Sequence, residues 1–303
     1  MNLLDTLSLG SKLQQNRPEW VTRAKCASRL ERNFLYDEIY VKKTYERHGV
    51  RIEAGIDEVI LDVGANIGLF SCFSSESSGQ RVLAIEPMPG TYSNLCYNVG
   101  LHDEWCHRNR VSKGQVVPVC VGLGSDMKSG QTFTYYPLAQ GWSTVASLED
   151  KRSMRRDLQV FVENALDQRS SSLPKFLVQI GLWVRYFGRP VLTMLTHVAA
   201  LILQFGSTQV ACDVVTLSHL IKTEGVDGIA LLKIDVERSE VGVVQGIERN
   251  DWGKIRQLVA EVHEENLEAF LGIVKEKGGF GNIVCEQVGD MVGTSLHMVY
   301  ATR

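Results

Sequence analysis

The stretch Ile60–Phe70, ILDVGANIGLF, decides the fold class of this chain. An apolar run ends at Asp62 and Val63, a turn with Gly64 and Gly68 follows, and a helical segment begins after the second glycine. Glycines in such a turn let the backbone approach a ligand that a Cβ atom would exclude. The N-terminus of the following helix offers unpaired N–H groups and a positive dipole end, which suit a carboxylate or a phosphate. The stretch therefore predicts a buried strand, a ligand-binding turn and a helix.

Similar apolar runs recur along the chain without the alternation of a half-exposed strand. Such runs are typical of strands buried on both faces of a parallel sheet. They lie at Glu58–Val63, Arg81–Ile85, Gln115–Val121, Ile229–Ile234 and Gln257–Val262, and helical stretches follow four of them at Gly68–Ser75, Tyr92–Gly100, Ser239–Ile247 and Glu265–Lys277. The alternation of strand and helix predicts an α/β fold with a doubly wound, Rossmann-like sheet.

The two ends of the chain have a different pattern. Asn282–Gln287 and Ser295–Ala301 are joined by a turn around Gly289 and Asp290, which predicts an antiparallel hairpin closing one sheet edge. Together with the five earlier runs, the hairpin makes a sheet of seven mostly parallel strands. Residues 1–56 are partly charged with fair helical spacing, so we expect cap helices there.

Composition limits the classes of function. The chain has 303 residues, of which 44% are hydrophobic and 22% charged, as in ordinary globular proteins, and its length suits two domains or one domain with additions. The formal net charge of −3 argues against nucleic acid as a partner. The seven cysteines form no CxxC pair, and the first residues, MNLLDTLSLG, lack the basic start of a signal peptide. We therefore expect reduced thiols and a cytoplasmic protein.

An insert at about 147–210 separates the third and fourth strands. Its stretch Phe176–Phe205 is the most apolar of the chain, but Arg185, Arg189 and Pro190 interrupt it. A membrane span needs about 20 unbroken apolar residues. The strands on both sides of the insert belong to one sheet, so a single crossing would separate them. We predict helices that form a lid or a homodimer interface, and peripheral contact with a membrane surface is the alternative.

The spacing of the glycine turn distinguishes between ligands. It is DxGxxxG rather than GxGxxG, because Asn66 stands where a dinucleotide loop has its middle glycine. The turn thus fits one small anion, such as an amino-acid carboxylate. Glu86 ends the second strand about 20 residues beyond Gly64, where an acid can bind both ribose hydroxyls. Taken alone, Asp62 is also explained as a capping acid and Glu86 as an exposed strand end.

Several motifs together resemble the FkbM-type S-adenosylmethionine-dependent methyltransferases. They are VILDVGANIGLFS, AIEP, LLKIDVERSEVGVVQGIE, IRQLVAEVHE and the closing HMVYATR, which is similar to members in natural-product assembly lines. The resemblance covers Tyr36–Val145 and Val214–Arg303. It implies a class I methyltransferase domain at 57–303, after the helical cap at 1–56, and most often O-methylation of a hydroxyl. Arg238 stands where this family usually has glycine.

The resemblance also implies which residues hold the cofactor. The methionine portion would contact Asp62, Gly64, Asn66 and Gly68; the ribose would contact Glu86; the adenine would border Gly122, Ser125 and Asp126; and the methyl group would lie beside Asp235. These positions follow the carboxyl ends of strands, where open α/β sheets bind ligands.

Two neighbouring strand ends carry the candidates for proton transfer. Glu237, two residues after Asp235, is explained equally well as a helix cap. Glu261 and His263 end the fifth strand and point to the same side of it. His263 has three interpretations: a structural histidine, a general base that is neutral at pH 7, or a metal ligand with Asp235 and Glu261. We predict His263 and Asp235 as catalytic residues and no metal, because no spacing requires a divalent ion.

The sequence therefore predicts an S-adenosylmethionine-dependent O-methyltransferase that acts on a small metabolite, such as a natural product or a sugar-like molecule. A membrane lipid or glycolipid is the alternative acceptor. A nicotinamide-dependent oxidoreductase and a non-catalytic nucleotide-binding module are alternatives of another class. DxGxxxG argues against the oxidoreductase, and the presence of Gly64, Glu86 and Asp235 argues against a module that has lost its activity.

Overall fold

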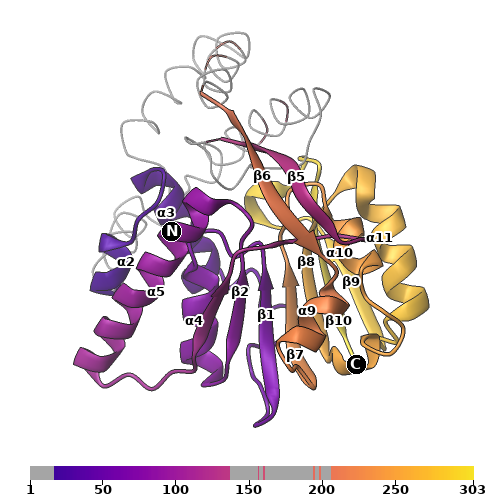
Figure 1. Cartoon of the computed structure of the whole chain (residues 1–303), viewed down its shortest axis with the longest axis horizontal. Coiled ribbons are helices and arrows are strands. Elements are labelled where there is room, and N and C mark those ends of the chain that lie inside the picture. Colours follow the sequence, from indigo (N-terminus) through magenta and orange to yellow (C-terminus); the bar gives the residue numbers. More distant parts are fainter. Residues whose placement is uncertain (1–16, 137–155, 157–159, 161–193, 195–197, 199–205) are drawn as a thin grey trace, which may run out of the picture.

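The computed structural model describes residues 17–136, 156, 160, 194, 198 and 206–303 (Figure 1). The insert expected at about 147–210 lies almost wholly outside these residues, so its helices and its role as lid, dimer interface or membrane contact remain predictions. Within the described ranges, no helix is long and apolar enough to cross a membrane. All seven cysteines are free thiols.

A seven-stranded sheet forms the centre of the protein (Figure 1). Its order is β3 (Val116–Val119), β2 (Val82–Ile85), β1 (Glu58–Val63), β7 (Gly228–Ile234), β8 (Gln257–His263), β10 (Leu296–Thr302) and β9 (Asn282–Glu286). The strands from β3 to β8 are parallel, and β10 is antiparallel to both neighbours. The doubly wound sheet and its closing hairpin are confirmed. The strand order reverses between β1 and β7, where such sheets bind ligands beyond their carboxyl ends.

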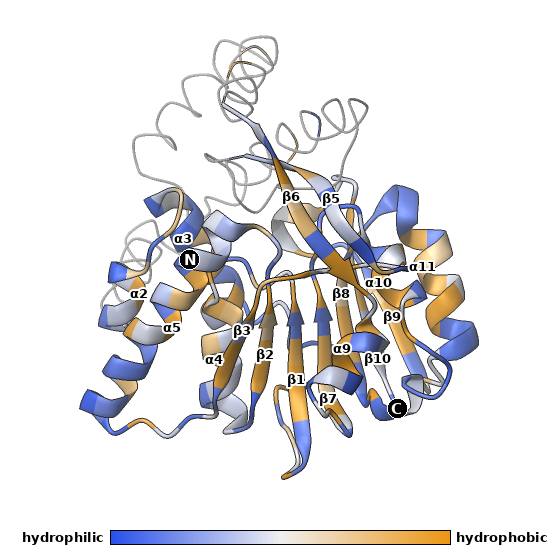
Figure 2. Cartoon of the chain, viewed as in Figure 1, coloured by the Kyte–Doolittle hydropathy of each residue, from blue (hydrophilic) through white to orange (hydrophobic). Residues whose placement is uncertain are grey.

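Helices cover both faces of this sheet. One face carries α2 (Glu19–Arg23), α3 (Arg29–Tyr36), the π-helix η1 (Asp37–Val41), α4 (Leu69–Ser78) and α5 (Pro89–Asn109), and the other carries α9 (Leu217–Thr223), α10 (Glu240–Gln245) and α11 (Glu264–Lys277). Short 3-10 helices lie at η3 (Trp252–Lys254) and η4 (Gly289–Met291). Ile60 faces the first core and Leu61 the second, and both are fully buried. Burial on both faces explains the continuous apolar strands, which are orange in Figure 2.

Two helical predictions can be compared with these elements. Cap helices before residue 57 are confirmed in α2 and α3, whose Trp20 and Tyr36 belong to the core of the first face. The helix expected at Tyr92–Gly100 is longer, because α5 continues through Gly100 and ends before Arg110 in a left-handed conformation.

A second, three-stranded sheet was not predicted. It consists of β4 (Gly122–Leu123), β6 (Thr208–Val215) and β5 (Lys128–Tyr135), in that order. The strand expected at Gln115–Val121 is thus too long: β3 ends at Val119, where the Val121 N–H bonds back to the Val119 carbonyl at 3.2 Å. Side chains of β5 and β6 pack on Met88, just after β2. This sheet therefore covers the carboxyl edge of the main sheet near the end of β2 (Figure 1).

Candidate active site

The turn between β1 and α4 is held by its own protein contacts. Gly64, Asn66 and Gly68 have φ angles of +81°, +48° and +86°, all left-handed. A Cβ atom on Gly64 would lie 1.8 Å from the Asp235 carbonyl oxygen, and one on Gly68 would lie 2.5 Å from Leu95 Cδ1. The sequence suggested that these glycines make room for a ligand. The structure shows that they also make room for the protein's own chain, and Gly64 thereby brings the turn against the end of β7.

Glu86 is fixed beside this turn. Its two carboxylate oxygens accept backbone hydrogen bonds from Asn66 and Met88, each at 3.0 Å. Burial raises the pKa of Glu86 to about 7, although these N–H groups and Lys233 act in the opposite direction. Asn66 Oδ1 is buried and has no hydrogen-bond partner among the described residues. The ends of β1 and β2 therefore carry an acid that titrates near neutrality and an unpaired amide oxygen.

A buried lysine joins β1 to β7. Lys233 Nζ lies 3.0 Å from Asp62 Oδ1, 3.0 Å from the Gly64 carbonyl oxygen and 3.3 Å from Asp235 Oδ2. Burial lowers the pKa of Lys233, but the Asp62 and Asp235 carboxylates outweigh it and hold the pKa above its ordinary value. Ser71 Oγ donates to the other Asp62 oxygen at 2.5 Å, and the Asp62 side chain is fully buried. The carboxylate expected to contact the cofactor thus serves the ion pair beneath the turn.

Asp235 is the more accessible acid of this group. It follows β7 directly, its backbone N–H donates to the Val63 carbonyl at 2.9 Å, and its side chain is 31% exposed. Oδ2 accepts a hydrogen bond from the Tyr45 hydroxyl at 3.2 Å and faces Lys233, whereas Oδ1 has no partner in the described part of the chain. Burial raises the pKa of Tyr45 well above its ordinary value, so the hydroxyl stays a donor. One oxygen of Asp235 is held in place and the other is free to accept a proton.

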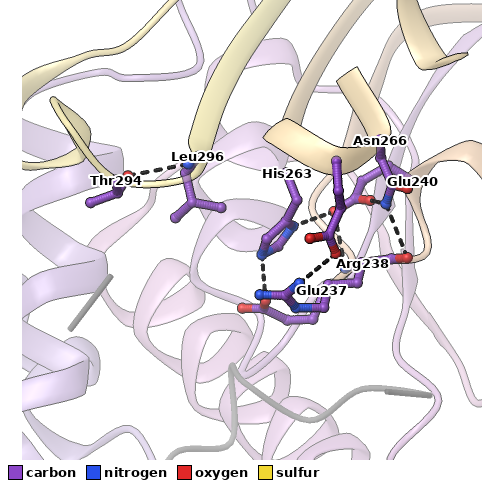
Figure 3. A network of polar contacts seen from close by, with 8 residues as sticks. Glu237, Arg238, Glu240, His263, Asn266, Thr294 and Leu296 are labelled. Carbon is purple, nitrogen blue, oxygen red and sulfur yellow. Dashed lines mark hydrogen bonds and ion pairs between the residues drawn. The ribbon is translucent and has the colours of Figure 1, made fainter. Parts of the chain in front are cut away.

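His263 lies between two carboxylates (Figure 3). Its Nδ1 is 2.7 Å from Glu240 Oε1, and its Nε2 is 3.4 Å from Glu237 Oε2. Burial lowers the pKa of His263, but the two acids raise it to about 10. The expectation of a neutral histidine therefore does not agree with the structure, because an imidazolium with both N–H groups directed at carboxylates has no lone pair for a substrate proton. Glu240 also accepts hydrogen bonds from Arg238 N and Asn266 Nδ2.

The alternative metal site is not supported by the geometry. Asp235, Glu261 and His263 do not bring three donor atoms together, and the set that does so in the described ranges, Glu76, His102 and Cys106, lies elsewhere. Burial, with help from Asp235 and other acids, raises the pKa of Glu261 well above its ordinary value. His263 directs both ring nitrogens at carboxylates, so it has no lone pair to offer a metal, which binds the neutral imidazole.

The residues expected near the adenine lie in β4 and directly after it. Gly122 lies in β4, which pairs with β6 in the second sheet. Ser125 Oγ donates to Asp126 Oδ2 at 2.7 Å, so these side chains contact each other rather than Glu86. The segment that meets Glu86 is the end of β3, where the Val119 carbonyl accepts the Glu86 N–H at 3.0 Å.

Comparison with known proteins identifies the family of this chain. Residues 62–292 match the methyltransferase FkbM domain. The chain belongs to the FkbM methyltransferase family. It is 35% identical over 276 residues to 31-O-demethyl-FK506 methyltransferase FkbM of Streptomyces tacrolimicus, covering 90% of both chains. It is also 26% identical over 262 residues to methyltransferase sdnD of Sordaria araneosa, covering 82% of this chain and 83% of that one.

One solved structure is similar as well. The crystal structure of methyltransferase FkbM from Methylobacillus flagellatus KT has a TM-score of 0.46 and 12% identity, over 99% of this chain and 59% of that chain. From the family and its methyltransferase relatives, the protein is a methyltransferase enzyme.

Arg238 lies at a loop position whose left-handed backbone conformation favours glycine. Arg238 has a φ of +62°, the left-handed conformation that glycine adopts freely and that costs another residue about 1–2 kcal/mol. Its N–H donates to Glu240, its carbonyl accepts from Asn266, and its guanidinium pairs with Glu265. These contacts offset the backbone strain and keep the loop before α10 in place.

Sequence reasoning missed two residues of the methyltransferase site. Lys233 had a signal, since it is the one charged residue in the buried run IALLKI and stands two positions before Asp235. Tyr45 had none, because it lies 190 positions from the Asp235 carboxylate that it contacts. Only folding brings the cap segment to the end of β7.

The charge of His263 predicts a pH-dependent contribution to stability. Its pKa is raised from 6.5 to about 10 in the fold, so its ion pairs stabilise the native state fully below pH 6.5, and this contribution is lost as the pH rises toward 10. We expect the free energy of unfolding of His263→Gln to lie below that of the parent near pH 6.5. The difference between the two proteins should shrink as the pH rises toward 10. Urea unfolding of both proteins, with the exposed-histidine variant His107→Gln as control, measures the difference. A pH-independent difference for His263→Gln would contradict the assignment.

Proposed function

We propose that this methyltransferase transfers the methyl group of S-adenosylmethionine to a hydroxyl oxygen of a small metabolite, such as a natural product or a sugar-like molecule. The observation that carries the proposal is a pair of acids at one sheet edge. Glu86 lies beside the glycine turn, and Asp235, whose side chain is 31% exposed, keeps one carboxylate oxygen free. The name of the Streptomyces relative, 31-O-demethyl-FK506 methyltransferase, describes methylation at an oxygen, which supports the same acceptor atom here.

The residues at this edge fit S-adenosylmethionine. Each Glu86 oxygen accepts one backbone hydrogen bond and keeps a lone pair for a ribose hydroxyl. Gly68 gives α4 no side-chain cap, so the first N–H groups of that helix suit the carboxylate of the cofactor. The buried, unpaired Asn66 Oδ1 is the kind of group whose partner is a ligand.

The chemistry divides between the cofactor and the chain. S-adenosylmethionine supplies a methyl group that the sulfonium charge already activates. The protein then has to place the acceptor hydroxyl and remove its proton. Asp235 is the base in this proposal, because Tyr45 and Lys233 hold Oδ2 and leave Oδ1 for the hydroxyl. His263, which the sequence suggested as base, becomes a positioning residue that joins the end of β8 to the start of α10.

Glu86→Gln tests the cofactor assignment. We expect S-adenosylmethionine affinity at pH 8 to fall about 10- to 100-fold, since hydrogen bonds to a charged acceptor are stronger by about 1 kcal/mol each than those to a neutral amide. Because the Glu86 pKa is about 7, ionisation of this acid makes the parent bind more tightly as the pH rises through neutrality, and the variant should lack this dependence. Titration calorimetry at several pH values measures both effects.

The control for this titration is Glu224→Gln, which removes an acid paired with Arg81 near the opposite ends of the strands. It should bind the cofactor like the parent. Equal affinity and equal pH dependence in folded Glu86→Gln would refute the assignment of Glu86. Binding of a nicotinamide cofactor in place of S-adenosylmethionine would favour the oxidoreductase alternative.

The acceptor is found with isotopically labelled S-adenosylmethionine and a metabolite pool. Label in a small polar product supports the proposal, and label confined to the lipid fraction points to a lipid or glycolipid acceptor. Flotation with liposomes and the mass of the protein in solution test the membrane-contact and homodimer predictions for the insert. The seven free thiols support a cytoplasmic location for these reactions.

A further inference from the structure

A second group of chemically active side chains lies between α4 and α5, on the helices of the first face. His102 and Cys106 are one turn apart on α5, and Glu76 is in the last turns of α4. His102 Nε2 lies 2.8 Å from Glu76 Oε1 and 3.2 Å from Cys106 Sγ. One donor atom from each residue lies within 4.8 Å of the other two. Glu76 is thus at the opposite end of α4 from the glycine turn, outside the candidate active site.

Hydrogen bonds to His102 Nε2 cannot use the Glu76 carboxylate and the Cys106 thiol proton at the same time. Nε2 is the nitrogen of His102 that faces both neighbours, since Nδ1 is buried without a partner among the described residues. A protonated Nε2 can donate to the Glu76 carboxylate but cannot accept the Cys106 thiol proton. An unprotonated Nε2 can accept from the thiol but then directs its lone pair at a carboxylate. A cation between the three atoms removes the conflict, because each residue then directs a lone pair at it.

The donor types and the spacing select the cation. Nitrogen, thiolate and carboxylate are the ligands of zinc, at about 2.0–2.3 Å from the metal. Tetrahedral ligation at these lengths separates the ligand atoms by about 3.3–3.6 Å, so Glu76 Oε1 and Cys106 Sγ would each move away from His102 Nε2 by about 0.3–0.5 Å. His102 and Cys106 are buried at 0% and 2% exposure, whereas the Glu76 side chain is 21% exposed, so the group borders solvent at Glu76.

We propose that Glu76, His102 and Cys106 bind one Zn²⁺ ion, with water as the fourth ligand, and that the ion ties α4 to α5. On binding, the Cys106 S–H bond is replaced by a sulfur–zinc bond and the proton passes to solvent, with no change of oxidation state. Two of the three ligands, His102 and Cys106, lie one turn apart on α5, and the third comes from α4. The role is structural, since the group lies outside the sheet edge that carries Glu86 and Asp235.

Cobalt(II) is the probe for this site. The full chain, stripped with a chelator, should take up one equivalent of Co²⁺ and develop visible bands of tetrahedral cobalt with a near-ultraviolet band of thiolate ligation, and Zn²⁺ should displace it. Zn²⁺ should also raise the melting temperature of the parent, whereas Mg²⁺ should not. Cys106→Ser should lose the thiolate band, and His102→Gln should bind roughly tenfold or more weakly.

Cys96→Ser is the matched control, because Cys96 is an exposed cysteine on the same helix. It should keep the thiolate band and the response to Zn²⁺. Glu76→Gln alters the most exposed of the three ligands rather than a fully buried one, so its loss of affinity tests the site even where Cys106→Ser fails to fold. Absence of the thiolate band in the parent, or its persistence in folded Cys106→Ser, would overturn the proposal.

Discussion

Asp235→Asn is expected to lower the rate of methyl transfer about 10²- to 10⁴-fold, the usual cost of losing a general base. The amide keeps the size of the side chain and still accepts the Tyr45 hydrogen bond, but it cannot take the proton of the acceptor hydroxyl. Cofactor affinity should change much less, because Glu86 follows β2, which lies across β1 from β7. Single-turnover transfer of labelled methyl at saturating S-adenosylmethionine measures the rate.

Two neighbouring variants separate proton transfer from positioning. Tyr45→Phe removes the hydrogen bond to Asp235 Oδ2, and His263→Gln removes the imidazolium between Glu237 and Glu240. Both should lower the rate less than Asp235→Asn does. A parent-like rate in Asp235→Asn combined with a large loss in His263→Gln would return the role of base to the histidine.

Lys233→Met should be the most destabilising single change in this region, by about 3–5 kcal/mol. It leaves the fully buried Asp62 without its cation, 3.0 Å away in the parent, and removes the donor to the Gly64 carbonyl. Such a loss is a large part of the 5–15 kcal/mol that holds a typical domain folded. Urea unfolding followed by circular dichroism measures the shift of the midpoint.

The double variant Asp62→Asn/Lys233→Met supplies the control for charge. It removes both members of the ion pair, so it should recover part of the stability that the single variant loses. Lys254→Met is the matched lysine control, because its pair with Asp251 is partly exposed, at 32% and 14% of the two side chains, and solvent-accessible pairs contribute about 1 kcal/mol or less. Equal midpoints for Lys233→Met and Lys254→Met would show that the buried pair contributes no more stability than the partly exposed pair.

The order of strands and helices could be read from the sequence because it depends on local patterns. Buried parallel strands need apolar side chains on both faces, so runs such as Glu58–Val63 stand out, and Gly64 and Gly68 mark the turn between strand and helix. The acids at Glu86 and Asp235 were predictable for the same reason, since the ends of parallel strands meet at one edge. The sheet of β5 and β6 escaped prediction, because its exposed residues give little hydrophobic periodicity.

Only the tertiary structure decided the charge states of the site residues and the groups that they contact. A pKa depends on burial and on charges that come from distant segments. The sequence supports a neutral His263, but the loop before α10 places Glu237 and Glu240 around it and makes it a cation. Asp62 and Asp235 are similar acids in sequence, yet Lys233 and Ser71 bind both oxygens of Asp62, whereas Asp235 keeps one free oxygen. The sequence alone thus determines the fold and the edge where chemistry occurs, whereas three-dimensional proximity decides which acid is free to react.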